Sequence, residues 1–261
     1  MMTLKNYNRD NPPIFIGGEG RSGTTLMRVI LNSHPNIACG PESQLFRDKK
    51  VEELYDYLLH TYFDRISDYS EEPDKYLAGS FRAMIDGFFE PYMLEQGKKR
   101  WAEKSPHNIV SIDFLLKVYE KDLKFIHMIR DGRDVVSSIL SMDWGPDNVT
   151  DAATRWSSII ENSLKHRGEP YYMEVKYEDL ADNPEKIVRE VCEFIGEEFD
   201  EQMLAYHKAD QHLGSNESSN SQVAKPIYKS SIGRWKTDLD QIQLHKFYEI
   251  AGKRLSELGY E

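Results

Sequence analysis

A glycine-rich turn between two apolar segments constrains the fold of this chain more than any other feature. Ile14, Phe15 and Ile16 have the β-branched and aromatic character of a buried strand, and the turn GEGRSGTT follows at residues 18–25. The next residues, LMRVI, continue as an amphipathic helix. This order predicts an anion-binding site, because backbone N–H groups in the turn and the positive end of the helix both attract a bound anion.

The turn has the G-x-x-x-x-G-x-[ST] spacing of a nucleotide P-loop, but Thr24 stands where a P-loop has its lysine. Arg21 places a guanidinium inside the turn instead, and this planar group binds phosphate or sulfate through two parallel N–H bonds. The missing lysine argues against a nucleoside triphosphate as the ligand. The alternative is a turn that only packs a helix on a sheet, and the arginine, two threonines and four glycines of residues 17–25 favour the anion site.

Length, charge and cysteine content narrow the class of protein. The 261 residues suit a single domain, and the net charge of −11 argues against a general binder of nucleic acid or membrane surfaces. No apolar run is long enough to span a bilayer and the N-terminus lacks the apolar core of a signal peptide, so we expect a soluble, cytoplasmic protein. Cys39 and Cys192 have no metal-ligand spacing, so we expect both to be reduced and buried.

Strand-like and helix-like segments alternate along the rest of the chain. Further strands are predicted at residues 37–39, from residue 100 to a Ser-Pro turn, at 123–130 and in the stretch YYMEVKY that ends near Tyr177. Helices are predicted from about residue 108, after residue 130, at about 150–165, from about Pro184 with Asn183 as N-cap, and at 240–258. Residues 51–97 read as two or three inserted helices and 215–239 as a loop. We therefore predict one α/β domain over residues 1–261, with three α/β/α layers around a parallel sheet.

Charged and polar residues follow several of the predicted strands. Glu42 comes after the strand at 37–39, Lys104 lies on the Ser-Pro turn, and Arg130 closes the strand at 123–130 with Ser138 two helical turns beyond it. Ligands of parallel α/β sheets bind beyond the carboxyl ends of the strands, so these residues should meet the glycine-rich turn at one edge. Arg21 and Arg130 then define two anion sites, which suits a nucleotide phosphorylated at two places.

Each of these residues also has a purely structural interpretation. Glu42 could cap a helix that begins after Pro41, and Lys104 could be a solvated charge beside Glu103. Arg130 and the following DGR could form a structural ion-pair cluster, and Tyr177 could be a core aromatic at a strand end.

Taken together, the motifs resemble those of the sulfotransferases that use 3′-phosphoadenosine 5′-phosphosulfate (PAPS), most closely the tyrosylprotein sulfotransferases. The resemblance lies in FIGGEGRSGTTLMR, CGPES, FIHMIRDGRDVVSS, VKYEDL and SNSQVAKPIYKSSIGRW, and covers nearly the whole catalytic core. It implies the P-loop-NTPase-like sulfotransferase fold, PAPS as donor, its desulfonated form PAP as product, and no metal.

The resemblance also implies a role for individual residues. Arg21, Ser22, Gly23, Thr24 and Thr25 would bind the 5′-phosphosulfate, while Arg130 and Ser138 would bind the 3′-phosphate. The remaining cofactor contacts would come from Tyr177 and from the covering loop with Gln222, Lys225 and Arg234, the last standing where the family has a lysine.

For catalysis, the resemblance implies in-line transfer of the sulfuryl group to an acceptor hydroxyl. Glu42 would be the general base, and Lys104 and Ser219 would stabilise charge at the transferring group. The family's basic residues just after the glutamate are Gln44 and Asp48 here, which disfavours an acidic peptide. A phenol, a tyrosine in another context, a sugar or a lipid hydroxyl all stay open as the acceptor. A P-loop kinase and a non-catalytic nucleotide-binding protein are the alternative functions.

Overall fold

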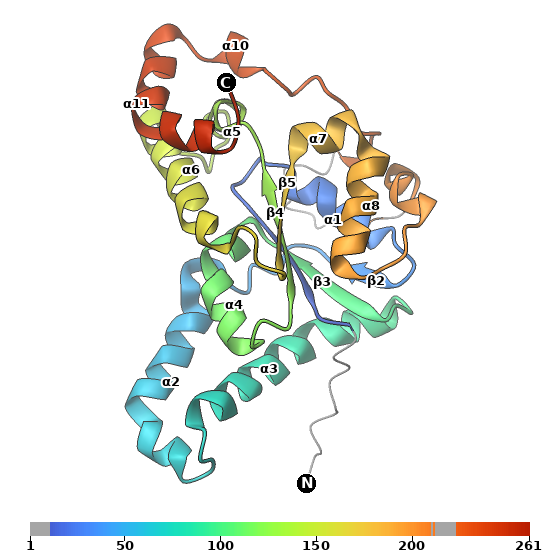
Figure 1. The fold of residues 1–261 in the computed structure, drawn as a ribbon, viewed down its shortest axis with the longest axis vertical. Coiled ribbons are helices and arrows are strands. Elements are labelled where there is room, and N and C mark those ends of the chain that lie inside the picture. The colour runs from blue at the N-terminus through green and yellow to red at the C-terminus, as the bar shows by residue number, and fades with distance from the viewer. Residues whose placement is uncertain (1–10, 210, 212–222) are drawn as a thin grey trace.

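A five-stranded parallel sheet forms the centre of the computed structural model, which describes residues 11–209, 211 and 223–261 (Figure 1). The strands lie in the order β2-β3-β1-β4-β5, so β1 is central and its neighbours β3 and β4 come later in the chain. Their bounds are Ile14–Gly17 for β1, Ile37–Cys39 for β2, Arg100–Lys104 for β3, Lys124–Ile129 for β4 and Tyr172–Lys176 for β5. All four pairings are parallel, which brings the carboxyl ends of the strands to one edge.

Successive residues of β1 point to opposite faces of the sheet, and each face has its own core. Ile14 and Ile16 pack in a cluster with α1 (Thr24–Asn32) and α8 (Pro184–Ile195). Phe15 packs on the other face with residues from α3 (Pro73–Glu95) and α4 (Ile112–Val118). Every residue of β1 is buried, because helices cover both faces (Figure 1). The predicted three-layer α/β/α fold is confirmed.

The remaining helices extend this frame at its two ends. Helices α2 (Lys50–Ser67) and α3 pack against each other and project from the sheet, in the range where inserted helices are predicted (Figure 1). A third apolar cluster joins the end of β4 to α5 (Gly132–Ile139), α6 (Val149–Ser163) and α11 (Gln241–Glu257). The shorter helices are α7 (Tyr177–Asp182) and α10 (Trp235–Asp238), and the 3₁₀ turns include η1 (Arg47–Lys49), η2 (Pro106–Ser111), η3 (Leu164–His166), η4 (Glu201–Met203) and η5 (Tyr206–Lys208).

Several predicted boundaries differ from the structure. The segment after Pro106 begins as the 3₁₀ turn η2, and its α-helix starts only at Ile112. Tyr177 opens α7 rather than closing β5. Helix α8 does begin at Pro184 with Asn183 at its N-cap position, as predicted, but the Asn183 side chain makes no capping hydrogen bond. The loop predicted at 215–239 contains the helix α10.

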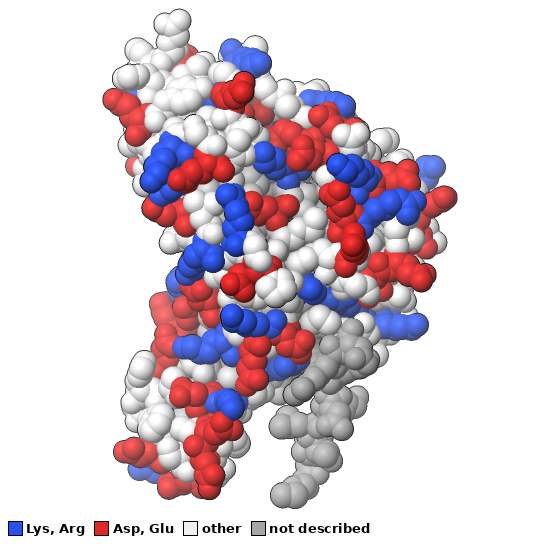
Figure 2. Space-filling model, in the orientation of Figure 1, with Lys and Arg blue, Asp and Glu red and all other residues white. Residues whose placement is uncertain are grey.

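The surface mixes charges of both signs. Figure 2 shows acidic and basic side chains interspersed over one face, without a separate basic half. Within residues 11–209, 211 and 223–261, no helix combines the length and the apolar character that crossing a bilayer requires. Cys39 and Cys192 are both buried, as expected from the sequence.

Candidate active site

A cavity of about 400 Å³ opens at the edge where the carboxyl ends of the strands meet. The segments that leave β1, β2, β3, β4 and β5 all contribute to its wall. This arrangement follows from the parallel sheet. Strand β1 lies at its centre with β3 on one side and β4 on the other, and a crevice forms beyond the carboxyl ends of these strands. The polar and charged lining residues are Arg21, Thr24, Thr25, Glu42, Gln44, Arg47, His107, Arg130, Ser138, Arg155, Tyr177, Tyr206, Tyr228, Ser231 and Arg234.

The glycine-rich turn holds a backbone conformation that its residues rarely adopt elsewhere. Gly23, the residue before α1, has φ 93°, and a Cβ there would lie 2.8 Å from the Tyr177 ring. Arg21 also has a positive φ of 71°, which is strained for a residue with a side chain. The turn is closed by the Ser22 N–H, which donates to the Glu19 carbonyl at 3.1 Å. The cavity wall therefore includes the first N–H groups of α1, which have no carbonyl partner within the helix.

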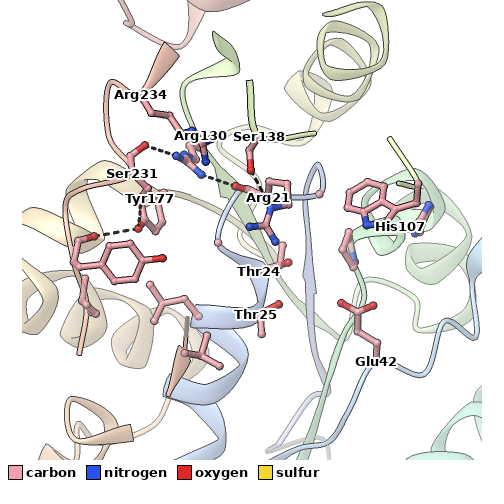
Figure 3. Close-up of a pocket in the computed structure, with 18 of the residues that line it drawn as sticks. Arg21, Thr24, Thr25, Glu42, His107, Arg130, Ser138, Tyr177, Ser231 and Arg234 are labelled. Atoms are coloured by element: carbon pink, nitrogen blue, oxygen red, sulfur yellow. Dashed lines mark hydrogen bonds between the residues drawn. The ribbon is translucent and has the colours of Figure 1, made fainter. Parts of the chain in front are cut away.

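Two arginines that follow different strands, β1 and β4, meet at one end of the cavity (Figure 3). Arg21 Nε donates to Ser138 Oγ at 3.1 Å, and Arg130 Nη1 donates to the Arg21 carbonyl at 2.9 Å. The Arg130 guanidinium also lies over the Tyr177 ring, 5.0 Å from its centroid. Burial, and then the neighbouring charge of Arg130, lowers the pKa of Arg21. The two guanidinium charges make this end of the cavity electropositive, which favours anionic ligands there.

The structural ion-pair cluster considered for the DGR segment also exists, but Arg133 carries most of it. Arg133 Nη2 lies 2.7 Å from the Asp131 carboxylate, whereas Arg130 Nη2 is 3.8 Å from Asp134. Asp134 accepts backbone N–H bonds from Gly233 at 2.8 Å and Trp235 at 3.0 Å. Burial raises the pKa of Asp134, and these donors oppose that shift. The cluster thus fastens the segment before α10 next to the cavity.

Lys104 and Glu42 form an ion pair at the opposite side of the turn. The Lys104 side chain is fully buried, and its Nζ donates to the Glu42 carboxylate and to Thr25 Oγ1 at 3.3 Å. The interpretation of Lys104 as a solvated charge is therefore wrong, because β3 ends inside the crevice. Glu42 lies in an irregular segment where no helix begins, so it is not the helix cap considered above.

Glu103, the neighbour of Lys104, has a different environment. Its carboxylate accepts hydrogen bonds from Ser43 at 2.9 Å and Ser105 at 2.6 Å, and a further one from Asn108. Burial raises the pKa of Glu103. These bonds tie the segment after β2 to the end of β3, so they fix the position of Glu42 indirectly.

The Glu42 side of the cavity contains residues that sequence reasoning missed. Arg155 on α6 donates to Glu19 through Nε at 3.0 Å, its Nη2 lies 2.8 Å from the same carboxylate, and the Glu19 side chain is almost fully buried. Burial raises the pKa of Glu19 and the Arg155 charge opposes this. Trp144 covers Gly20, where a Cβ would lie 3.1 Å from the indole. The sequence signal for Glu19 is a charged residue inside a glycine-rich turn. No local sequence pattern indicates that Arg155 or Trp144 lines the cavity.

The segment after residue 222 covers the Arg130 side of the cavity. The Tyr177 hydroxyl bonds to Ser231 Oγ at 2.9 Å and donates to the Tyr228 carbonyl at 3.2 Å (Figure 3). Arg234 lines the cavity and donates to Asp238 at 2.7 Å. Lys225 does not line it: its side chain is exposed, and its carbonyl accepts a bond from the Tyr206 hydroxyl.

The predicted site residues are thus only partly brought together. Those that line the cavity are Arg21, Gly23, Thr24, Thr25, Glu42, Arg130, Ser138, Tyr177 and Arg234. Ser22 and Lys104 are buried behind the wall, and Ser219 and Gln222 lie outside the described residues. In the part of the chain that the structure describes, no group of three His, Cys, Asp or Glu side chains is arranged to hold a metal ion.

Known proteins share both the sequence pattern and the fold. The sulfotransferase family profile matches residues 12–201. Protein-tyrosine sulfotransferase A of Caenorhabditis elegans is 28% identical, over 98% of this chain and 69% of its own length. Human protein-tyrosine sulfotransferase 1 is 29% identical, over 98% and 71%. The predicted resemblance to tyrosylprotein sulfotransferases is therefore confirmed.

Solved structures extend the comparison to the fold. The sulfotransferase domain of the Synechococcus PCC 7002 olefin synthase superposes with a TM-score of 0.65 at 24% identity, over 94% of this chain and 95% of that one. Mouse sulfotransferase SULT7A1, solved in complex with PAP, gives a TM-score of 0.57 at 14% identity, over 96% and 86%. The matches favour sulfuryl transfer over the kinase and non-catalytic alternatives. With the family profile spanning most of the chain and the fold shared, the chain belongs to the sulfotransferase family and is an O-sulfotransferase.

Proposed function

We propose that this sulfotransferase takes its sulfuryl group from PAPS and transfers it to an acceptor hydroxyl, with Glu42 as the general base. One observation carries the proposal: the buried Lys104 ammonium lies between the Thr25 hydroxyl at the start of α1 and the Glu42 carboxylate. A cation next to an anion cradle on one side and next to a cavity-lining carboxylate on the other suits the chemistry of group transfer.

The residues present fit a donor with two anionic groups. Arg21 and the first N–H groups of α1 form one positive region, and Arg130 with Ser138 forms the other. Arg130 is nearly buried, and its Nε has no hydrogen-bond partner among the described residues. A buried guanidinium N–H without a partner is costly, so a ligand anion that accepts from it stabilises the site. The Tyr177 ring supplies an aromatic surface beside Arg130.

Each catalytic residue would then perform a definite task. When bound, PAPS supplies a sulfuryl group that is activated by a phosphate leaving group. Glu42 accepts the proton of the acceptor hydroxyl, a contribution of ~10²- to 10⁴-fold for a well-placed base. Lys104 holds a positive charge in a buried position, where its attraction for developing negative charge is only weakly screened by water.

The acceptor is proposed to be a phenolic hydroxyl, free or in a tyrosine. The relatives named above are protein-tyrosine sulfotransferases, which supports this class. Gln44 lines the cavity, whereas the exposed Asp48 lies outside it beside Arg47. Arg47 is the cation of residues 42–50 that lines the cavity and is offered to an acceptor. The cytoplasmic location expected from the sequence stays a prediction.

Ligand-dependent unfolding tests the choice of donor. A ligand that binds only the folded chain raises the free energy of unfolding, by about 2.7 kcal/mol at a concentration of one hundred times its Kd. We expect PAP to raise the melting temperature and ATP with magnesium to leave it unchanged. Stabilisation by ATP with magnesium, without any by PAP, would contradict the proposed donor.

A further inference from the structure

A second hollow, of about 220 Å³, lies beside the active-site cavity between η2 and α6. Its floor is apolar, with Ile109, Val110 and Ile159 contributing side chains, and Ser158 stands at its exposed edge. We call this hollow the side groove. Its volume lies below the roughly 300–1,000 Å³ typical of sites that enclose a whole small molecule, so it suits one part of a larger ligand.

The side groove and the active-site cavity share part of their walls. Pro106, His107 and Arg155 line both spaces, so the two spaces adjoin along these residues. His107 also lies on the same side of the cavity as Glu42 (Figure 3). The side groove is therefore the space across this shared wall from a molecule whose hydroxyl is bound next to Glu42.

The shared wall carries little net charge. The Arg155 guanidinium donates to Glu19 through Nε and forms a salt bridge with the same carboxylate through Nη2, so the two charges compensate each other. Burial, and then the charges of Arg155 and Arg47, lowers the pKa of His107, which keeps its imidazole neutral at pH 7. An acidic extension would meet no uncompensated cation in this wall, whereas an apolar one would gain from contact with the three aliphatic side chains.

We propose that the side groove is an acceptor subsite that holds an uncharged, apolar arm of the acceptor molecule. This inference rests on the proposed function, because it assumes that the acceptor hydroxyl is bound next to Glu42. It specifies the acceptor class as amphipathic phenols, in which the hydroxyl faces the active-site cavity and the apolar substituent lies between η2 and α6.

Binding of para-alkylphenols to the complex of the full chain with PAP tests the subsite without requiring turnover. The substituents run from methyl to hexyl, and titration calorimetry gives the Kd of each phenol. We expect the Kd to fall by about 3- to 4-fold for each added methylene until the side groove is full, the gain for moving one methylene out of water. An unchanging Kd along the series, no binding of any member, or tighter binding of an acidic tyrosine peptide would overturn the subsite.

Two variants test whether the apolar arm of the acceptor lies in the side groove. Ser158→Phe fills the side groove from its exposed edge, and Val110→Asp places a charge on its apolar floor. Each should remove the gain with chain length and leave the Kd of para-methylphenol and of PAP unchanged. Ser256→Phe, the same substitution on an exposed position of α11 that lines neither space, should behave as wild type. An unaltered gain in both groove variants would show that the arm lies elsewhere and overturn the proposal.

These measurements distinguish a wrong donor from a wrong acceptor subsite. Absence of PAP binding to the wild-type chain contradicts the proposed function itself. Normal PAP binding together with a Kd that ignores chain length contradicts only the side-groove subsite.

Discussion

Lys104 Nζ and the Glu42 carboxylate form a salt bridge between two residues 62 positions apart in the chain. The Lys104 side chain is fully buried, while 21% of the Glu42 side chain is exposed. A buried ammonium without a partner costs several kcal/mol, so the salt bridge holds Glu42 against the end of β3. The exposed part of Glu42 faces the cavity, which is where a base must meet an acceptor hydroxyl.

Replacing Glu42 by Gln should separate catalysis from binding. The amide keeps the shape of the side chain and an oxygen for Lys104 but accepts a proton poorly, so we expect kcat to fall at least ~10²-fold. The Kd of PAP should not change, since Lys104 rather than Glu42 contacts Thr25 at the cradle. Steady-state kinetics and calorimetry give the two quantities. Glu53→Gln, which breaks an exposed salt bridge to Lys50, is the control, and a kcat equal to that control would remove Glu42 as the base.

The salt bridge also predicts an asymmetry in stability. Glu42→Leu deprives the buried ammonium of its carboxylate and should lower the free energy of unfolding by about 2–4 kcal/mol, since breaking one side of a buried pair is the costly change. Adding Lys104→Met should recover part of this loss, because the uncompensated charge is gone. Denaturant unfolding of both single variants and the double variant measures the coupling. Strictly additive losses would mean that the two side chains do not stabilise each other.

Arg130→Lys should weaken PAP binding without unfolding the chain. Arg130 donates to the carbonyls of Arg21 and Ser231 and still has Nε available, and a lysine cannot maintain this fork. We expect the Kd of PAP to rise about 10-fold or more, the loss of one charge-assisted hydrogen bond. Arg189→Lys, on the exposed side of α8 next to Glu185, is the matched control. Equal PAP affinities for the two variants would exclude Arg130 from the binding site.

Gly23→Ala should distort the cradle. The substitution forces a side chain into a left-handed conformation and brings its Cβ to 2.8 Å from the Tyr177 ring. We expect a loss of about 1–2 kcal/mol in the free energy of unfolding from the conformation alone, together with weaker PAP binding. Gly79→Ala on α3 meets no atom within 4 Å and should slightly stabilise the helix. If both alanine variants were equally stable and bound PAP alike, the close approach of Gly23 to Tyr177 would be of no consequence.

The sequence predicts the cradle well because its determinants are local. Strand, turn and helix between residues 14 and 32 follow from neighbouring residues, and Arg21 and Arg130 meet because both follow parallel strands. The side chain of Lys104 shows the limit of prediction from sequence. In β3, alternate residues point to opposite faces, but only the partners reveal that Lys104 faces Glu42 and Thr25 rather than water.

Contacts between distant segments account for what sequence reasoning missed. Glu19 and Arg155 are 136 residues apart, and no local pattern indicates that α6 packs beside the glycine-rich turn. The side groove exists only because of this packing. The short helix α10 was also missed, since it is held by Asp134, which accepts bonds from the backbone of Gly233 and Trp235.

His127 on β4 predicts how stability depends on pH. It is fully buried, its Nδ1 lies 2.6 Å from the Tyr172 hydroxyl, and burial lowers its pKa to about 3 from the ordinary 6.5. The unfolded chain therefore takes up a proton below pH 6.5 that the folded chain refuses until about pH 3, so stability is full above 6.5 and falls through this window. Between pH 6 and pH 5 we expect a loss of about 1 kcal/mol from this residue. Urea unfolding of the wild type and of His127→Gln measures it; an equal pH dependence in both would contradict the assignment.

Transfer of label from PAPS tests the central claim most directly. The chain is incubated with PAPS that carries a radioactive sulfur label, together with para-alkylphenols, tyrosine peptides and glycans, and the products are separated. We predict that label appears on a hydroxyl of the phenolic acceptors and that PAP is released in equal amount. A chain that binds PAP but moves no label to any hydroxyl, or that transfers phosphate from ATP instead, would contradict the proposed sulfuryl transfer.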